Sequence, residues 1–242
     1  MILKEKTRSN IPFVPKLEEN GEPLIPASCY PERILVRPQY FIQGLEGSIP
    51  ECYVRRGVYE RLVEAAESLP KGWKLILLDC WRSLELQKTL FFKICKELRE
   101  SNKDLTEEEI RKKAETFVAL PSEDPMHPPG HVTGGAVDLT ISDAKGRILY
   151  MGSDFDETTE RSFTNYYKDL VKEGKALSGR EKEAMRNRDI LLEVMERSGF
   201  SNYPKEWWHF DFGNINWAIR TGARKAIYGK TSPNFRWAGS AL

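Results

Sequence analysis

The sequence predicts an α+β fold in which a small, mostly antiparallel sheet is flanked by helices. Stretches with helical periodicity and short apolar runs follow one another in the order helix, strand, helices, strand, helix, strand. The intervals between them are too uneven for a regular series of strand–helix–strand units. No internal repeat and no long linker divides the 242 residues, so residues 1–242 are expected to form a single domain.

The first third of the chain combines an irregular segment with one helix and one strand. Residues 1–55 are rich in Pro and Gly and are predicted to wrap the core as loops and short strands. A helix is expected from about Val58 to Leu69, where apolar residues recur at helical spacing. The turn residues at 70–72 end it, and the apolar run from Trp73 to Asp79 predicts a buried strand.

Polar capping residues mark the next helices along the chain. Ser83 can cap one helix. Thr106 and Glu109 form a capping box for another, which is expected to reach about Ala119. The segment from Pro121 to Gly135 is so rich in Pro and Gly that it is predicted to be irregular.

The remaining elements alternate between strand and helix. Residues Ala136 to Ile141 are predicted as a strand. Ser178 and Glu181 form a second capping box, whose helix is expected to end near Arg197. The run from Trp207 to Phe212 is predicted as a final aromatic strand.

The composition argues against several classes of partner. The 37 basic and 36 acidic residues nearly cancel, whereas proteins that bind nucleic acid usually carry a basic excess on one face. We interpret the locally basic tail from Arg220 to Lys230 as a solvated face. No stretch approaches the roughly 20 apolar residues that cross a membrane, and the N-terminus lacks the apolar core of a signal peptide. The sequence therefore predicts a cytoplasmic protein and leaves its oligomeric state open.

The cysteines give no sign of a thiolate metal site, because no two of them are spaced as CxxC. We expect them to be buried small hydrophobes in a reducing compartment, and their even number leaves disulfides open. The four are Cys29, Cys52, Cys80 and Cys95.

Two of the three histidines lie in segments unlike the rest of the chain. The first segment runs from His131 to Asp138 and contains two consecutive glycines. Along a strand that begins near Ala136, Val137 and Leu139 would face the core, so Asp138 would point the other way. The glycines let the backbone turn, which could bring His131 over the same face.

The second segment runs from Glu206 to Phe212 and is rich in aromatic residues. His209 and Asp211 share one face of the expected strand, in a partly dry environment that strengthens electrostatic interactions. In an unbroken strand Glu206 and His209 would point to opposite faces. We therefore expect Glu206 just before the strand or at a bulge.

Two imidazoles and one carboxylate suit a single zinc ion, and three protein ligands leave the fourth tetrahedral position for water. Such a site needs a base to take a proton from water, and Glu206 is the candidate. Arg82, between a buried strand and a helix, could stabilise an oxyanion. Each residue alone also has a structural interpretation: His209 as a packed core residue, Asp138 as a turn cap and Arg82 as a helix-end charge.

The sequence resembles a known family, the zinc D-alanyl-D-alanine dipeptidases of the vancomycin-resistance type. These belong to a wider group of zinc DD-peptidases that shares a fold with the hedgehog signalling domain. The spacing of His131, Gly134, Ala136 and Asp138 matches the family's first pattern, and EWWH at 206–209 matches its Glu-x-x-His. The segment DCWRS resembles the family's Asp-x-x-Arg, and the resemblance spans roughly the region from position 55 to 215.

The resemblance implies zinc ligation by His131, Asp138 and His209. It implies Glu206 as general base and acid, and Arg82 as the arginine that steadies the transition state. It also implies the small antiparallel sheet and cleavage of a short D-amino-acid peptide.

Three further residues bear on the substrate. Asp156 ends a stretch that resembles the family segment whose last Asp helps to hold the substrate's free amine. Where the family has a serine, two residues before the first His, this chain has Pro129, which offers neither a hydroxyl nor a backbone N–H. The identity of the dipeptide is therefore left open. His127 matches no family position and is interpreted as a loop residue.

The sequence supports three hypotheses. The first is zinc-dependent hydrolysis of D-alanyl-D-alanine or a similar short D-amino-acid dipeptide. The second keeps the mechanism but acts on longer peptidoglycan peptides, as a carboxypeptidase or endopeptidase. The third is a non-catalytic, zinc-stabilised binding module, against which Glu206 argues because a structural metal needs no base.

Overall fold

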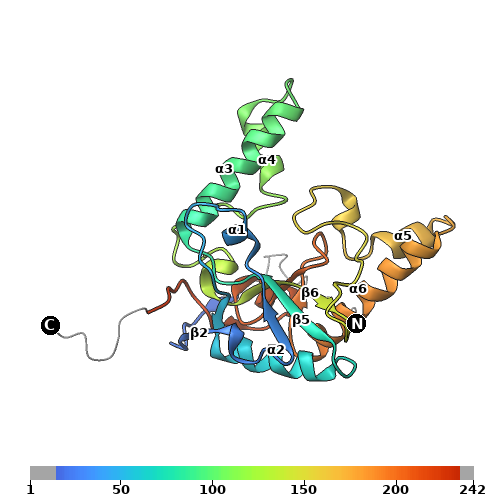
Figure 1. Ribbon diagram of the computed structural model, residues 1–242. Helices are drawn as coiled ribbons and strands as arrows, with labels where there is room; N and C mark the ends of the chain where they lie inside the picture. The colour runs from blue at the N-terminus through green and yellow to red at the C-terminus, as the bar shows by residue number, and fades with distance from the viewer. Residues whose placement is uncertain (1–14, 235–242) are drawn as a thin grey trace, which may run out of the picture.

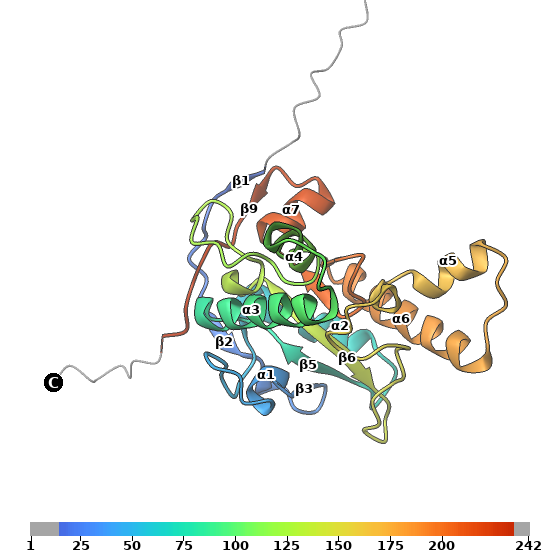
Figure 2. The same cartoon turned by 90° about the horizontal axis from the view of Figure 1, so that it is seen from above.

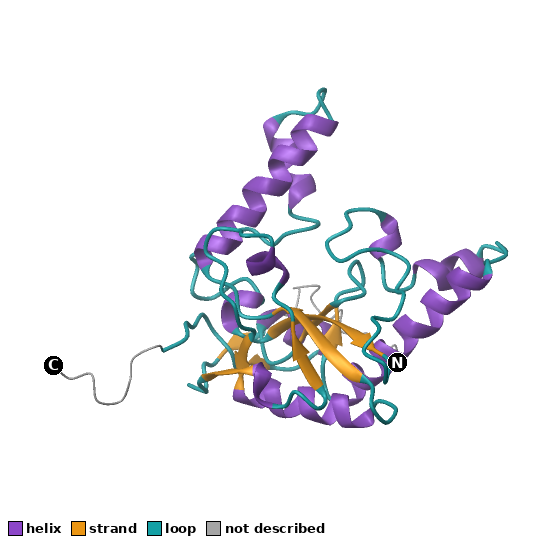
Figure 3. Cartoon of the chain, viewed as in Figure 1, coloured by secondary structure: helices purple, strands orange, loops and turns teal. Residues whose placement is uncertain are grey.

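A mixed five-stranded sheet forms the centre of the protein, as the computed structural model shows for residues 15–234 (Figure 3). Residues 1–14 and 235–242 lie outside the described part, together with the N-terminal segment on which the signal-peptide interpretation rested. The strand order is β3-β5-β6-β8-β7. These strands are β3 (Ile34–Val36), β5 (Lys74–Asp79), β6 (Ala136–Ser142), β7 (Ser201–Asn202) and β8 (His209–Asp211).

The sheet departs from the predicted small, mostly antiparallel one. Strand β3 runs parallel to β5, while the other three pairs are antiparallel. The extra strand comes from residues 1–55, a segment predicted to wrap the core as loops and short strands and not to enter the central sheet. Three apolar residues in a Pro-rich stretch are too weak a local signal for a core strand. Backbone hydrogen bonds to β5 stabilise the strand despite this weak signal. Arg37 N–H also donates to the Leu77 carbonyl at 2.8 Å.

Two small sheets involve the terminal parts of the described chain. Strand β1 (Lys16–Leu17) pairs in parallel with β9 (Lys225–Ala226). Strand β2 (Leu24–Pro26) pairs in antiparallel fashion with β4 (Tyr53–Arg55). The short helices η1 (Ala27–Cys29) and α1 (Gln39–Ile42) lie between β2 and β4 in sequence.

One buried arginine ties these segments together. Arg55 is 2% exposed, and its guanidinium donates to the carbonyl oxygens of Thr133 at 2.8 Å and Gly229 at 3.0 Å. It also forms an ion pair with Glu19 at 2.9 Å. The N-terminal segment, the C-terminal segment and the turn after His131 are therefore held by a single side chain.

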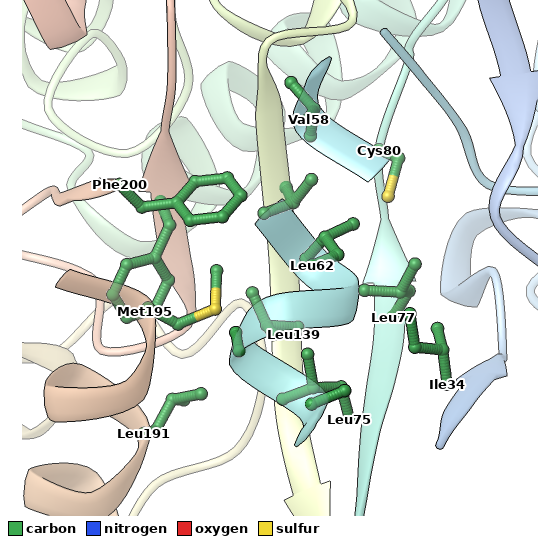
Figure 4. Packing of buried hydrophobic residues seen from close by; sticks show 14 of the residues in the cluster. Ile34, Val58, Leu62, Leu75, Leu77, Cys80, Leu139, Leu191, Met195 and Phe200 are labelled. Atoms are coloured by element: carbon green, nitrogen blue, oxygen red, sulfur yellow. The ribbon is translucent and has the colours of Figure 1, made fainter. Parts of the chain in front are cut away.

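Helices α2 (Arg56–Ser68) and α6 (Gly179–Arg197) pack against one face of the sheet and against each other. Figure 4 shows Leu62 of α2 and Met195 of α6 directed into the same core as Leu139 of β6. The predicted helix at 58–69 is confirmed. So is the capping box of α6, in which the Ser178 hydroxyl accepts from the Glu181 backbone N–H.

Helices α3 (Leu84–Ser101) and α4 (Glu107–Ala114) form a hairpin that stands away from the sheet on the side opposite α2 (Figures 1 and 2). Both predicted N-caps are present, at Ser83 and Thr106. Helix α4 ends at Ala114, although the prediction carried it to about Ala119. The next residues include β-branched and aromatic side chains, and the residue before Pro121 is disfavoured in a helix.

Shorter elements complete the fold. They are η2 (His131–Thr133), η3 (Glu160–Ser162), α5 (Tyr166–Lys172) and α7 (Ile215–Thr221). Across residues 15–234, no helix combines the length and apolar character needed to cross a membrane. All four cysteines are free; three are buried as predicted, whereas Cys29 is exposed.

We expect the buried side chains of β6 to contribute strongly to the free energy of unfolding. Ile141 is fully buried (0% exposed), so Ile141→Ala should lower the free energy of unfolding by roughly 2–5 kcal/mol through lost burial and a cavity. Ile148, nearby in sequence, is 48% exposed, and Ile148→Ala should change it by about 0.5 kcal/mol or less. Urea unfolding of both variants measures the difference, and equal effects would contradict this assignment of the core.

Candidate metal centre

Three potential ligand atoms meet at the sheet face opposite α2. Asp138 of β6 and His209 of β8 are directly opposed in the antiparallel register, so their side chains emerge side by side. His131 reaches the same point from η2, because the backbone reverses through Gly134, which has a φ of +69°. The three residues predicted from the sequence are therefore brought together.

The spacing of these atoms fits one metal ion. His131 Nε2 lies 3.2 Å from His209 Nδ1 and 3.4 Å from Asp138 Oδ2. His209 Nδ1 lies 3.0 Å from Asp138 Oδ1. Ligands about 2.0–2.1 Å from a tetrahedral zinc are separated from one another by about 3.3 Å. The chain thus presents three corners of a tetrahedron of the right size.

The far nitrogen of each imidazole has its own acceptor. His131 Nδ1 lies 2.6 Å from the Cys80 carbonyl oxygen, and His209 Nε2 lies 3.1 Å from Asp211 Oδ2. With N–H groups assigned to these two nitrogens, the lone pairs of His131 Nε2 and His209 Nδ1 both face the cluster. Both rings are therefore oriented to bind a cation.

The electrostatics of the cluster favour positive charge. Burial alone lowers the pKa of His209, but Asp211 and Asp138 outweigh burial and raise that pKa to about 10. Burial alone raises the pKa of Asp138, but His131 and His209 outweigh it and hold the pKa well below its usual value. A metal cation gains from the same negative field as a proton on His209 does.

Glu206 lies in the turn that precedes β8, as its required orientation predicted. The His209 backbone N–H donates to the Glu206 carbonyl at 3.3 Å, and this turn places Glu206 Oε2 3.8 Å from His209 Nδ1. No lysine or arginine of residues 15–234 is within ion-pair distance of this carboxyl group. Burial raises the pKa of Glu206 to about 8.

Arg82 is a fixed, buried cation beside the ligands. Its guanidinium donates twice to Asp79 Oδ2, at 2.8 and 3.1 Å, and once to the Gln87 side chain at 2.9 Å. It lies 3.8 Å from Asp138 Oδ2. Because its partners occupy one side of the group, the charge is held in place without rearrangement.

Asp156 faces the same cleft from the loop between β6 and α5. Its φ of 63° is unusual for a residue other than glycine, and the Tyr40 hydroxyl donates to its carboxylate at 3.0 Å. Asp156 is exposed to solvent in the cleft that it lines, and its carboxyl group is only partly desolvated there. This partial desolvation and the charge of Asp138 raise its pKa to about 7.

Arg188 of α6 fixes the loop that carries Asp156. Its guanidinium donates to the carbonyl oxygens of Met151 at 2.6 Å and of Arg161 and Phe163 at 2.7 Å each. Burial lowers the pKa of Arg188 to about 10, because carbonyl oxygens rather than a carboxylate surround it. Both ends of the loop are thereby pinned to one side chain.

All six predicted site residues line one cleft of about 300 Å³, and Pro129 lines it as well. They are Arg82, His131, Asp138, Asp156, Glu206 and His209. His127 lies outside the cleft, exposed and paired with Asp124 at 2.9 Å, as expected of a loop residue.

The interpretation of the basic tail as a solvated face is wrong for Arg220. This residue lines the cleft and is hydrogen-bonded to Asp211, because α7 turns its last residues back onto β8. Arg224, Lys225 and Lys230 are exposed, as predicted.

Sequence reasoning missed four residues of the site: Tyr40, Gln87, Asp211 and Arg220. Asp211 could have been found, because strand alternation already placed it on the face of His209. The other three approach the cleft through tertiary packing and leave no sequence signal.

Comparison with known proteins identifies the family of this chain. The model of a family described as D-ala-D-ala dipeptidase (Peptidase M15) matches residues 50–223. The chain belongs to this family. A D-alanyl-D-alanine dipeptidase of Synechocystis sp. is 30% identical over 86% of this chain and 89% of its own length. The dipeptidase of that name from Escherichia coli is 40% identical over 34% of this chain and 36% of its own.

Two solved structures of related peptidases also show similarity. VanYB in complex with D-Ala-D-Ala is 20% identical, with a TM-score of 0.41 over 73% of this chain and 82% of that one. A zinc complex of the D,D-pentapeptidase VanY is 18% identical, with a TM-score of 0.36 over 75% and 84%. These scores are low, so membership of the dipeptidase family rests on the sequence matches.

We expect Arg188→Met to loosen the loop that carries Asp156. Loss of three hydrogen bonds should increase amide hydrogen exchange across residues 151–163, because the loop opens more often. Arg186→Met, at an exposed position of the same helix, is the matched control and should leave exchange unchanged. Equal exchange in the two variants would show that Arg188 does not hold the loop.

Proposed function

We propose that this protein is a zinc-dependent peptidase that hydrolyses D-alanyl-D-alanine or a similar short D-amino-acid dipeptide, with one zinc ion per chain. The observation that carries the proposal is the convergence of His131 Nε2, His209 Nδ1 and Asp138 at zinc-ligand spacing. Glu206, which no lysine or arginine of the described chain pairs with, lies beside them. Membership of the dipeptidase family supports the same activity.

The charges of the cleft support a substrate with a free amine. Five carboxyl groups stand in the cluster against two guanidinium groups, those of Arg82 and Arg220, which leaves three negative charges when all five carboxyl groups are ionised and the imidazoles are neutral. A divalent metal ion and one ammonium group would balance them. The five carboxyl groups are those of Asp79, Asp138, Asp156, Glu206 and Asp211.

His131, Asp138 and His209 would hold the zinc. When bound, the metal supplies Lewis acidity, which polarises the scissile carbonyl and makes water a stronger acid. Glu206 accepts the proton of the attacking water and returns it to the departing amine. Its raised pKa suits a group that must hold a proton between these two steps.

Arg82 and Asp156 have complementary roles at the two ends of the reacting group. Arg82 donates to the oxygen on which negative charge develops, from a position fixed by Asp79 and Gln87. Asp156 pairs with the substrate ammonium and excludes a longer chain on that side. Pro129 cannot donate a hydrogen bond, so the rest of the dipeptide is recognised by other groups.

Two alternatives remain distinct hypotheses. Hydrolysis of longer peptidoglycan peptides would require the substrate to pass Asp156, and a zinc-stabilised binding module would have no use for Glu206. A panel of D-D, L-D and L-L dipeptides and of longer peptides ending in D-Ala-D-Ala separates the first two. The cytoplasmic location likewise stays a prediction from the sequence.

Glu206→Gln should abolish most turnover and leave zinc binding intact. The amide keeps the size of the side chain but cannot accept the proton, so kcat should fall by roughly 10²–10⁴. Zinc content and the melting temperature should stay near those of the wild type. Glu193→Gln, on the exposed face of α6, is the control. Undiminished turnover in the Glu206 variant would refute the assigned role.

Asp156→Asn should weaken binding of substrates that carry a free amine. KM for D-Ala-D-Ala should rise about 10-fold or more, whereas an N-acetylated dipeptide, which lacks the ammonium, should be unaffected. The wild-type KM should rise as the pH falls through about 7, because Asp156 becomes protonated there, and the variant should lose this dependence. An equal change for both substrates would contradict the role.

A further inference from the structure

We propose that Asp211 and Arg220 form a positioning pair behind His209, which holds the imidazole in the orientation and tautomer that a metal ion requires. The inference rests on the zinc centre proposed above and concerns two residues outside its ligand set. Neither touches the substrate in this role, so both are positioning residues.

Asp211 is placed by the strand itself. It follows His209 by two residues in β8, so both side chains emerge on the same face. Asp211 is 0% exposed, and its Oδ2 accepts from His209 Nε2 at 3.1 Å. The imidazole thus lies between the ligand cluster on its Nδ1 side and a carboxylate on its Nε2 side.

The carboxylate of Asp211 has no freedom to move. Its Oδ1 accepts from the Asn214 amide at 2.5 Å, and its Oδ2 accepts from Arg220 Nη1 as well as from His209. Gly130 packs so closely that a Cβ there would lie 2.9 Å from Asp211 Oδ1. Each oxygen is therefore fixed by partners from neighbouring elements of the fold.

An imidazole that binds a metal through one nitrogen needs a hydrogen-bond acceptor at the other. A neutral ring carries one N–H, and only the other nitrogen can donate a lone pair to a metal. The acceptor at Asp211 places the N–H on Nε2 and so keeps Nδ1 open toward His131 and Asp138. A proton on Nδ1 would instead point into the cluster and exclude the metal.

Arg220 compensates the negative charge of the buried Asp211. An isolated carboxylate with 0% exposure would be costly, and the guanidinium compensates its charge. The Arg220 side chain also lies over the Tyr203 ring at 5.2 Å, and this ring meets the His209 ring edge-on at 6.1 Å. Arg220 therefore supports His209 by two routes, one polar and one through packing.

The two histidine ligands differ in how they are anchored. His131 Nδ1 lies against the backbone carbonyl of Cys80, which no substitution removes, with Asp79 Oδ2 3.3 Å away. The acceptor for His209 Nε2 is a side chain, that of Asp211. Metal affinity should therefore be sensitive to substitution at Asp211 and Arg220.

The test is zinc affinity, measured by competition with a chromogenic chelator on the full chain. Asp211→Asn should weaken zinc binding by about 10–100-fold, because the amide is a poorer acceptor and cannot pair with Arg220. Asp143→Asn is the matched control, since Asp143 also pairs with an arginine but lies on an exposed turn. It should bind zinc as tightly as the wild type.

A spectroscopic signal separates positioning from a general structural effect. In the zinc-loaded wild type, the His209 Nε2–H should give a downfield, slowly exchanging proton resonance. This resonance should shift upfield or exchange away in Asp211→Asn, while melting in EDTA reports the fold alone. A folded variant that retains both the resonance and wild-type zinc affinity would overturn the proposal.

Arg220→Gln decides the question if Asp211→Asn does not fold. Arg220 is 24% exposed, so its replacement is less disruptive, and a loss of about 5-fold or more in zinc affinity is expected. Unchanged affinity would overturn the proposal. The readout does not involve turnover. A protein that leaves D-Ala-D-Ala intact but loses zinc on these substitutions would therefore refute the dipeptidase function and support the positioning pair.

Discussion

The pairing of β6 with β8 is the interaction on which the rest of the site depends. Because the register opposes Asp138 to His209, two ligands separated by 71 positions in sequence become neighbours without any loop to place them. Both strands lie inside the sheet, between β5 and β7. Backbone hydrogen bonds on both sides therefore set the ligand geometry, which gives the centre a rigid base.

Around this base, each charged group is held by the kind of partner that its task allows. Arg82 is held in place by two hydrogen bonds to Asp79 and one to Gln87, which leave two of its five N–H groups for other acceptors. Glu206 has no lysine or arginine partner in the described chain and keeps its capacity to exchange a proton. Asp156 sits on a loop whose backbone carbonyl oxygens are bound by Arg188. The Asp156 carboxylate itself accepts a hydrogen bond from Tyr40 and is not paired with an arginine of the part of the chain that the structure describes. The permanently charged Arg82 is thus hydrogen-bonded to other side chains, whereas the carboxyl groups that gain and lose a proton, Glu206 and Asp156, have no lysine or arginine partner among residues 15–234.

The sequence predicted the parts of the fold that have strong local signals. The capping boxes at Thr106 and Ser178, the apolar run of β5 and the strand geometry around Asp138 were all recovered. Short strands were expected within residues 1–55, but β3 was not located there because three residues carry too little periodicity. Helix α4 was predicted too long because its C-terminal end, unlike its capped N-terminal end, carries no strong stop signal before Pro121.

In the site, too, residues in segments with a local sequence pattern were predicted, and residues placed by tertiary packing were not. The ligands and Glu206 were accessible because they occur in patterned segments with defined spacing. Arg220 was misassigned because charge density along the chain does not show which residue of a tail folds back. Gln87 and Tyr40 meet the cleft only through packing between distant elements.

The position of β8 within the sheet has a consequence for biosynthesis. It is an inner strand, yet residues 209–211 are synthesised after every other strand of the central sheet. Until then the edge of β6 has no partner on that side, and only two of the three ligands exist. Completion of the proposed ligand set and closure of the sheet therefore depend on the same short segment. Shortened products released before this point retain an open, aggregation-prone edge.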